Sequence, residues 1–249
     1  MTLLLPREHG AYGQLLLPLL AALGLWGSPR PVSWLIGLTA VVLFWAHEPL
    51  LVWLGQRGTR PKRERGRRAG WLILLLLGVA TCALFAGLKL LPRGLWWALG
   101  LPAGLGLLVL PWLLLHKEKT TAAELLVAVA LSAWAVPVLL SKGVALSRSL
   151  QLWLVMVELF GVAVLGVRGL MQKLSIGWSR GAAGLGLIGS LWAHQLGLLP
   201  EQVVVAMLPT CGLAFVLFLA RPGPRYLRQV GFGILAVALL EILLLARLG

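Results

Sequence analysis

Long apolar runs separated by short bursts of charge are the feature that most constrains what this chain can fold into. The runs are about 17–25 residues long, the length that a helix needs to cross a bilayer. Only 12% of the residues are charged and 59% are hydrophobic, whereas a soluble domain has about 25% charged residues. We therefore predict one transmembrane domain over residues 1–249, an all-α, polytopic helical bundle.

The hydropathy pattern divides the chain into nine spans. They cover residues 12–27, 33–54, 70–91, 95–115, 121–140, 150–167, 182–199, 202–220 and 230–247. Proline and glycine occur inside several spans, which membrane helices tolerate. The first run resembles the others and is not a distinct signal peptide.

The basic residues orient these spans. With the N-terminus inside, the inner segments carry sixteen Lys and Arg residues and the outer segments carry six. Because Lys and Arg are retained on the cytoplasmic side, this split predicts a protein of the inner (cytoplasmic) membrane with a cytoplasmic N-terminus and, after nine spans, an outside C-terminus. The same rule accounts for the net charge of +14 without a nucleic-acid partner.

Residues 47–68 contain the densest group of ionisable side chains in the sequence. His47 and Glu48 come near the inner end of the second span, and Pro49 is expected to break the helix just after them. A loop from Gln56 to Arg68 is expected next, with seven basic residues. This basic segment is either a topology signal that also touches anionic lipid or part of a ligand site.

Topology brings other ionisable residues to the same depth, where such groups usually face a partner or a cavity. The residues expected to line one cavity on the inner side are Arg7, Glu8, His9, His47, Glu48, Arg57, Arg60, Glu158, Arg168 and Lys173. A buried carboxylate must find a cation or take up a proton. Glu48 and Glu158 are therefore either structural ion-pair partners of Arg7, Arg60 or Arg168, or members of a ligand site.

Metal chemistry is not expected. The chain has no aspartate, and adjacent residues on a helix diverge by about 100°, so Glu8-His9 and His47-Glu48 each offer at most one ligand to a given point. No metal or other cofactor is predicted. Cys82 and Cys211 have no metal or disulfide spacing and are expected to be small core residues. His194 and Glu241 are expected to be satisfied polar contacts in the core.

Residues 6–12, Pro-Arg-Glu-His-Gly-Ala-Tyr, and residues 47–50, His-Glu-Pro-Leu, resemble the YwiC-like family of bacterial integral membrane proteins. The resemblance in span pattern covers nearly the whole chain. It implies a multi-pass membrane protein and carries no activity with it.

A weaker resemblance is to the UbiA superfamily of intramembrane prenyltransferases, which have nine spans and a cytoplasmic-side active site. Glu48 stands where their first aspartate-rich motif begins, residues 58–61 resemble the loop that follows it, and residues 168–173 resemble their second motif. Those enzymes use aspartates to hold magnesium on a diphosphate. Since this chain has none, the resemblance implies a degenerate UbiA-like scaffold without magnesium-dependent chemistry.

Three functions remain open at this point. The first is binding of an isoprenoid or another anionic-headed membrane lipid, with Arg57, Arg60, Arg168 and Lys173 meeting phosphate. The second is a membrane scaffold or partner-binding protein without chemistry. The third is a small-solute transporter with Glu48 and Glu158 as intramembrane sites, although its halves show none of the self-similarity that many transporters have.

The charge split generates a topology prediction. Reporter fusions after Arg68 and after Gly249 should report opposite sides of the membrane, the first cytoplasmic and the second outside. The measurement is the activity of a reporter that works on one side only. If both fusions report the same side, the nine-span arrangement is wrong.

Overall fold

The structure, a computed structural model, describes residues 9–171 except 116 and 118, residues 194, 195, 197 and 199–220, and residues 224–248. For residues 9, 60, 170, 218–220 and 224 it describes the backbone only. The regular elements in these ranges are all helices. They are α1 (His9–Gly24), α2 (Pro31–Leu54), α3 (Thr59–Leu90), η1 (Arg93–Leu99), α4 (Gly100–Leu114), α5 (Thr121–Ser132), α6 (Ala135–Ser141), α7 (Leu146–Leu170), α9 (Glu201–Ala220), η2 (Pro224–Tyr226) and α10 (Leu227–Leu248).

The described helices confirm a multi-pass membrane bundle. Six segments are long and apolar enough to cross a membrane, namely Pro31–Leu54, Pro61–Leu90, Arg93–Leu114, Thr121–Ser141, Leu146–Gly169 and Leu227–Leu248. Gly10–Gly24 and Glu201–Leu217 form shorter apolar helices. Together these segments overlap eight of the predicted spans. The remaining span, 182–199, falls largely outside the described residues, so the count of nine stays a prediction.

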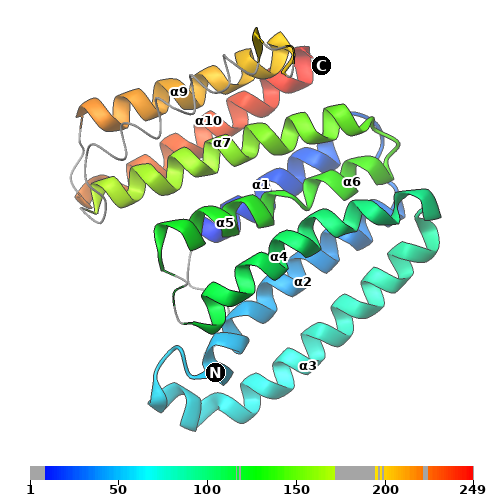
Figure 1. Ribbon diagram of the computed structural model, residues 1–249, viewed down its shortest axis with the longest axis vertical. Coiled ribbons are helices and arrows are strands. Elements are labelled where there is room, and N and C mark those ends of the chain that lie inside the picture. Colours follow the sequence, from blue (N-terminus) through cyan, green and yellow to red (C-terminus); the bar gives the residue numbers. More distant parts are fainter. Residues whose placement is uncertain are drawn as a thin grey trace.

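The bundle is arranged around α1. This helix contacts α2, α5, α6, α7 and α10, and its residues Leu15, Leu19 and Ala22 are almost completely buried. Figure 1 shows the α2–α3 hairpin along one side of the bundle and α9 with α10 along the other. The centre is therefore filled by α1, and the last helices pack back onto the first.

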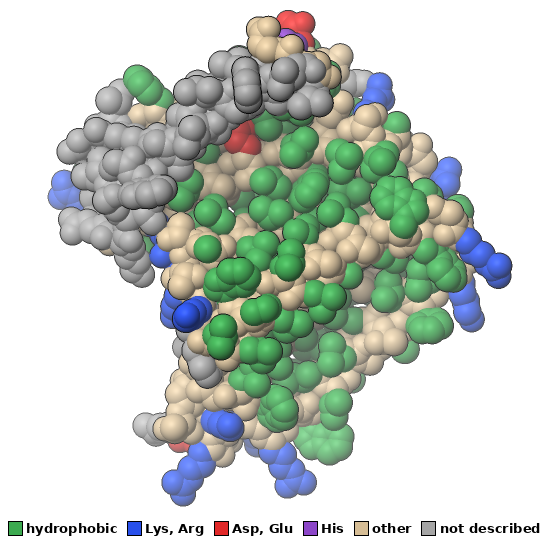
Figure 2. Space-filling view, in the orientation of Figure 1, with side chains coloured by type: hydrophobic (Ala, Val, Ile, Leu, Met, Phe, Trp, Pro, Cys, Tyr) green, Lys and Arg blue, Asp and Glu red, His purple; other side chains and the backbone are tan. Residues whose placement is uncertain are grey.

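The surface of the bundle is apolar where a soluble protein would be polar. Figure 2 shows hydrophobic side chains over a broad band across the helices, with Lys and Arg side chains near its two edges. On α3 the side chains of Trp71, Leu75 and Phe85 are more than half exposed, as lipid-facing side chains must be. Cys82 lies exposed on the same helix. Its predicted place in the core was wrong, because an apolar residue of a lipid-facing helix need not be buried by protein.

The basic segment after α2 also differs from the prediction. Residues 59–68 belong to α3, so most of the predicted loop is helical. Pro61 does not prevent this, because the first turn of a helix has backbone N–H groups without helical partners and proline lacks only that group. Pro49 does not break α2 either, since the helix continues to Leu54. Membrane helices accommodate an interior proline through local adjustments and neighbouring groups.

A short glycine turn reverses the chain between α2 and α3. Gly55 has a φ of +83°, which residues with a side chain rarely adopt. The Gly55 amide donates to the Val52 carbonyl at 3.1 Å, and the Gln56 amide donates to the Leu51 carbonyl at 2.9 Å. Glycine in this conformation satisfies the last carbonyls of a helix. The turn therefore ends α2 and directs the chain back into α3.

Lys142 connects the ends of α6 and α1. Its Nζ donates to the carbonyl oxygens of Ala22 at 2.8 Å and Leu23 at 2.9 Å, and also to that of Leu25. Lys142 is only 6% exposed. Carbonyls at a helix C-terminus lack helical partners and carry partial negative charge. The ammonium group therefore caps α1 from a helix more than a hundred residues away in sequence.

This contact generates a stability prediction. Lys142→Met should lower the free energy of unfolding by about 2 kcal/mol, because three buried carbonyls lose a charged donor. Thermal unfolding of the purified protein in detergent would measure the change. Lys89→Met is the matched control, since Lys89 is exposed and should change stability by less than about 0.5 kcal/mol. Equal effects would contradict the capping role of Lys142.

Candidate functional site

The buried carboxylate of Glu48 is paired with Arg57 across the turn between α2 and α3. Arg57 Nε lies 3.0 Å from Oε1 of Glu48, and Arg57 Nη2 lies 2.7 Å from Oε2. Glu48 is 4% exposed, so the guanidinium supplies the counter-charge that its burial requires. Arg57 was not among the three cations expected for Glu48. It was instead expected to meet phosphate, yet its Nε and Nη2 are both directed at this carboxylate.

Arg168 forms a second ion pair, between α7 and α5. Its Nε lies 2.7 Å from Oε2 of Glu124, and its Nη2 donates to the carbonyl oxygen of Lys119. Arg168 is 8% exposed. Glu124 lies in the first turn of α5, where a negative charge also complements the helix dipole. The guanidinium therefore joins the end of α7 to the start of α5. Sequence reasoning had placed Arg168 in the site without identifying Glu124 as its partner.

The two ion pairs lie at the same end of the bundle, where α2 and α7 end and α3 and α5 begin (Figure 1). The structure describes several of the other predicted site residues only in part or not at all. Arg7, Glu8 and Lys173 lie outside the described residues, and for His9 and Arg60 only the backbone is described. His47 is half-buried on α2 beside Glu48. That all ten predicted residues line one cavity therefore stays a prediction.

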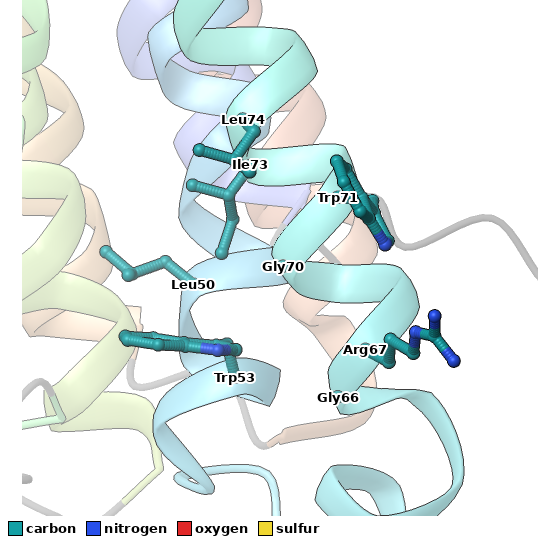
Figure 3. A pocket seen from close by; sticks show the side chains of 8 residues that line it. All are labelled: Leu50, Trp53, Gly66, Arg67, Gly70, Trp71, Ile73 and Leu74. Atoms are coloured by element: carbon teal, nitrogen blue, oxygen red, sulfur yellow. The ribbon is translucent and has the colours of Figure 1, made fainter.

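A groove lies between α2 and α3, the two helices that the Glu48–Arg57 turn connects. Its volume is about 450 Å³, and it is lined by Leu50, Trp53, Gly66, Arg67, Gly70, Trp71, Ile73 and Leu74. Figure 3 shows Leu50 and Trp53 extending from α2 to one side, whereas Arg67 and Trp71 extend from α3 to the opposite side, away from Trp53. The residues that line the groove are mostly apolar side chains and glycines, and Arg67 is the charged residue among them.

Two glycines on α3 shape this groove. Gly66 and Gly70 are one helical turn apart, and both line it. A Cβ built on Gly70 would lie 3.6 Å from Cδ1 of Trp53, so the indole packs directly against the α3 backbone. Any longer side chain at position 70 would compete with Trp53 for this space. None of the groove residues was among the predicted site residues, although tryptophans near span ends are typical of the membrane interface.

Glu158 lies in the middle of α7 and faces α9. Its Oε1 accepts a hydrogen bond from Sγ of Cys211 at 3.4 Å. Its Oε2 is buried and has no hydrogen-bond partner in the described part of the chain. The expected arginine or lysine partner is therefore not found among those residues. Glu241, for which no role was predicted, is completely buried on α10 and accepts hydrogen bonds from Thr210.

The described residues contain no group of three or more His, Cys, Asp or Glu side chains that could hold a metal ion. Glu48 and Glu124 are each engaged by an arginine. The described residues at this end of the bundle therefore combine guanidinium groups with a mostly apolar groove.

Comparison with known proteins adds one family match. The sequence model described as "YwiC-like protein" matches residues 5–139, which is more than half of the chain and includes both α2 and α3. No curated protein matches the chain, and no solved structure matches it.

The buried ion pair generates a prediction. Glu48→Gln should lower the free energy of unfolding by about 3 kcal/mol, because Arg57 keeps its charge and loses the carboxylate. Thermal unfolding in detergent would measure this. Glu124→Gln is the comparison, since the side chain of Glu124 is 40% exposed and its loss should cost less than about 1 kcal/mol. If Glu48→Gln with Arg57→Gln costs as much as the sum of the two single changes, the pair is not coupled.

Proposed function

The chain belongs to the YwiC-like protein family, and from this premise we propose that it is a multi-pass membrane protein that binds a lipid with an anionic, phosphate-bearing head. The observation that carries the proposal is the α2–α3 groove, whose lining is mostly apolar and includes one charged residue, Arg67. A lipid has the same two parts, an apolar chain and a charged head. Along α3 the groove residues likewise run from the charged Arg67 to the aliphatic Ile73 and Leu74.

The exposed face of α3 supports this assignment. Arg63, Arg67, Trp71 and Leu74 follow one another at intervals of four, four and three residues, and all four side chains are exposed. Such spacing places them on one face of a helix. Along that face the side chains change from charged to aromatic to aliphatic. This is the order of layers met on passing from the head groups of a bilayer into its hydrocarbon.

The chemistry of each part fits its proposed role. A guanidinium group binds phosphate oxygens through paired hydrogen bonds and keeps its charge at any physiological pH. Tryptophan prefers the membrane interface, where Trp53 and Trp71 would flank the part of the lipid next to its head. Leu50, Ile73 and Leu74 line the same groove and would contact the chain. A volume of about 450 Å³ fits part of one lipid molecule.

The finer parts of the proposal concern scaffold and orientation. We infer a degenerate UbiA-like scaffold, nine spans, an inner-membrane location and a cytoplasmic N-terminus. The support is the position of Glu48 near the end of α2, followed by residues 58–61, and the basic segment at the start of α3. On this basis the lipid head lies on the cytoplasmic side. Recognition by arginine needs no magnesium, so the proposal includes no magnesium-dependent step.

This proposal generates a binding prediction. Arg67→Ala should reduce the amount of phosphate-bearing lipid that co-purifies in mild neutral detergent by about tenfold, the loss expected from one charge-assisted hydrogen bond. Native mass spectrometry after adding either phosphatidylglycerol or a prenyl monophosphate would measure it. Retention of both lipids identifies the phosphate head as the recognised group. Retention of the prenyl compound alone identifies an isoprenoid chain as well.

Arg68→Ala is the matched control. Arg68 is exposed on the same helix turn, so its removal changes the net charge equally but leaves the groove lining intact. Gly70→Leu is a second variant, which keeps every arginine and fills the space beside Trp53. It should reduce lipid retention as well. Equal losses for Arg67→Ala and Arg68→Ala would reduce the basic segment to a topology signal, and no retention of either lipid by the wild type would overturn the proposal.

A further inference from the structure

Two carboxyl groups from different helices contact the same turn of α9, in the half of the bundle away from the groove. Glu158 of α7 and Glu241 of α10 are held on two consecutive residues of α9. Cys211 Sγ donates to Oε1 of Glu158 at 3.4 Å. The Thr210 amide donates to Oε1 of Glu241 at 3.2 Å, and the Thr210 hydroxyl donates to the same oxygen. Since α7, α9 and α10 pack against one another, the two carboxyls share one interior region.

One oxygen of each carboxyl has no hydrogen-bond partner among the described residues. Oε2 of Glu158 and Oε2 of Glu241 are both buried, and within the described ranges neither has a hydrogen-bond partner. Glu241 is 0% exposed. Glu158 lies near the middle of α7, about 18 Å of helix rise from either end. Glu158 is therefore far from both ends of its helix, and Glu241, about 10 Å of rise from the end of α10, has no exposed surface.

α9 contains a proline directly before Thr210. Pro209 lies inside the helix, has no N–H of its own, and its ring clashes with the carbonyl one turn earlier. The next amide, that of Thr210, donates to Glu241. Pro209 thus directs a backbone donor toward one carboxyl of the pair.

No described cation accompanies the two carboxyls. On α7, α9 and α10 the other ionisable side chains described are Cys211, which contacts Glu158, and Glu201, Arg148, Arg168, Arg228 and Arg247 near helix ends. On α1 and α5, which also pack against these helices, Tyr12 contacts Phe44 and Glu124 contacts Arg168. Two uncompensated negative charges in this interior would be very unfavourable.

From this arrangement we infer that Glu158 and Glu241 form an intramembrane proton-binding pair. The ligand is the proton, carried on the oxygens that have no other partner. Thr210 and Cys211, which are consecutive residues of α9, donate to the opposite oxygens of the two carboxyls. Buried carboxyls of this kind mark proton relays in membrane proteins. The pair would therefore serve a proton-coupled step of this protein, a function separate from lipid binding at the α2–α3 groove.

Infrared difference spectroscopy of the full-length protein in vesicles tests this inference. We expect a carbonyl band of protonated carboxylic acid that shifts in D₂O and is lost as the pH is raised from about 5 to about 10. Glu158→Gln and Glu241→Gln should each remove part of the band, and the double variant should remove all of it. Glu201→Gln is the matched control, because Glu201 is exposed at the start of α9 and its substitution should leave the band unchanged.

The wild-type spectrum alone can overturn the inference, whether or not the variants fold. No protonated carboxyl band, or a band that neither responds to pH nor shifts in D₂O, would show that the carboxyls do not exchange protons. A band that sodium chloride removes and potassium chloride does not would identify sodium as the ligand in place of the proton. Lipid retention should be unaffected by Glu241→Gln, so this test and that of the groove are independent.

Discussion

The cost of an unpaired polar group in hydrocarbon is the constraint on which this structure depends. It explains why the buried charges at the ends of the bundle have close partners. Glu48 is held by Arg57, Arg168 by Glu124 and the Lys119 carbonyl, and Lys142 by three carbonyls at the end of α1. The same constraint makes Glu158 and Glu241 conspicuous, because each of them has one buried oxygen without a described partner.

The sequence predicted the fold class and most helix positions, because apolar run length measures directly whether a helix can cross a bilayer. The sequence-based prediction was wrong where it applied rules for single residues, such as helix breaking by proline, to helices in a membrane bundle. Pro49 was expected to end α2, and residues 59–68 were expected to form a loop because they are so strongly charged. Both expectations are reasonable in water. They fail here because α2 tolerates an interior proline and arginine and lysine are good helix formers.

The candidate site was less predictable, because topology gives the depth of a residue but not its direction around the helix axis. Depth alone placed Glu48 and Arg168 at one end of the bundle, which the structure supports (Figure 1). Their partners, Arg57 and Glu124, depend on direction. So does the groove, although Arg67 and Trp71 one turn apart were a readable signal. Glu241 was expected to be a satisfied contact in the core, whereas one of its oxygens has no described partner. Its environment is formed by α9, which is close in space only after folding.

The cap that Lys142 places on α1 has a consequence for how the protein is made. A ribosome synthesises α1 well before it reaches α6. Until Lys142 has been added to the chain, the carbonyls of Ala22, Leu23 and Leu25 lack the donor that they have in the folded protein. Until α5 is made, α2 is the one helix already synthesised among those that contact α1. The central helix of the finished bundle is therefore among the last to become fully enclosed. Biogenesis of this protein must keep its first helix accessible until the middle of the chain arrives.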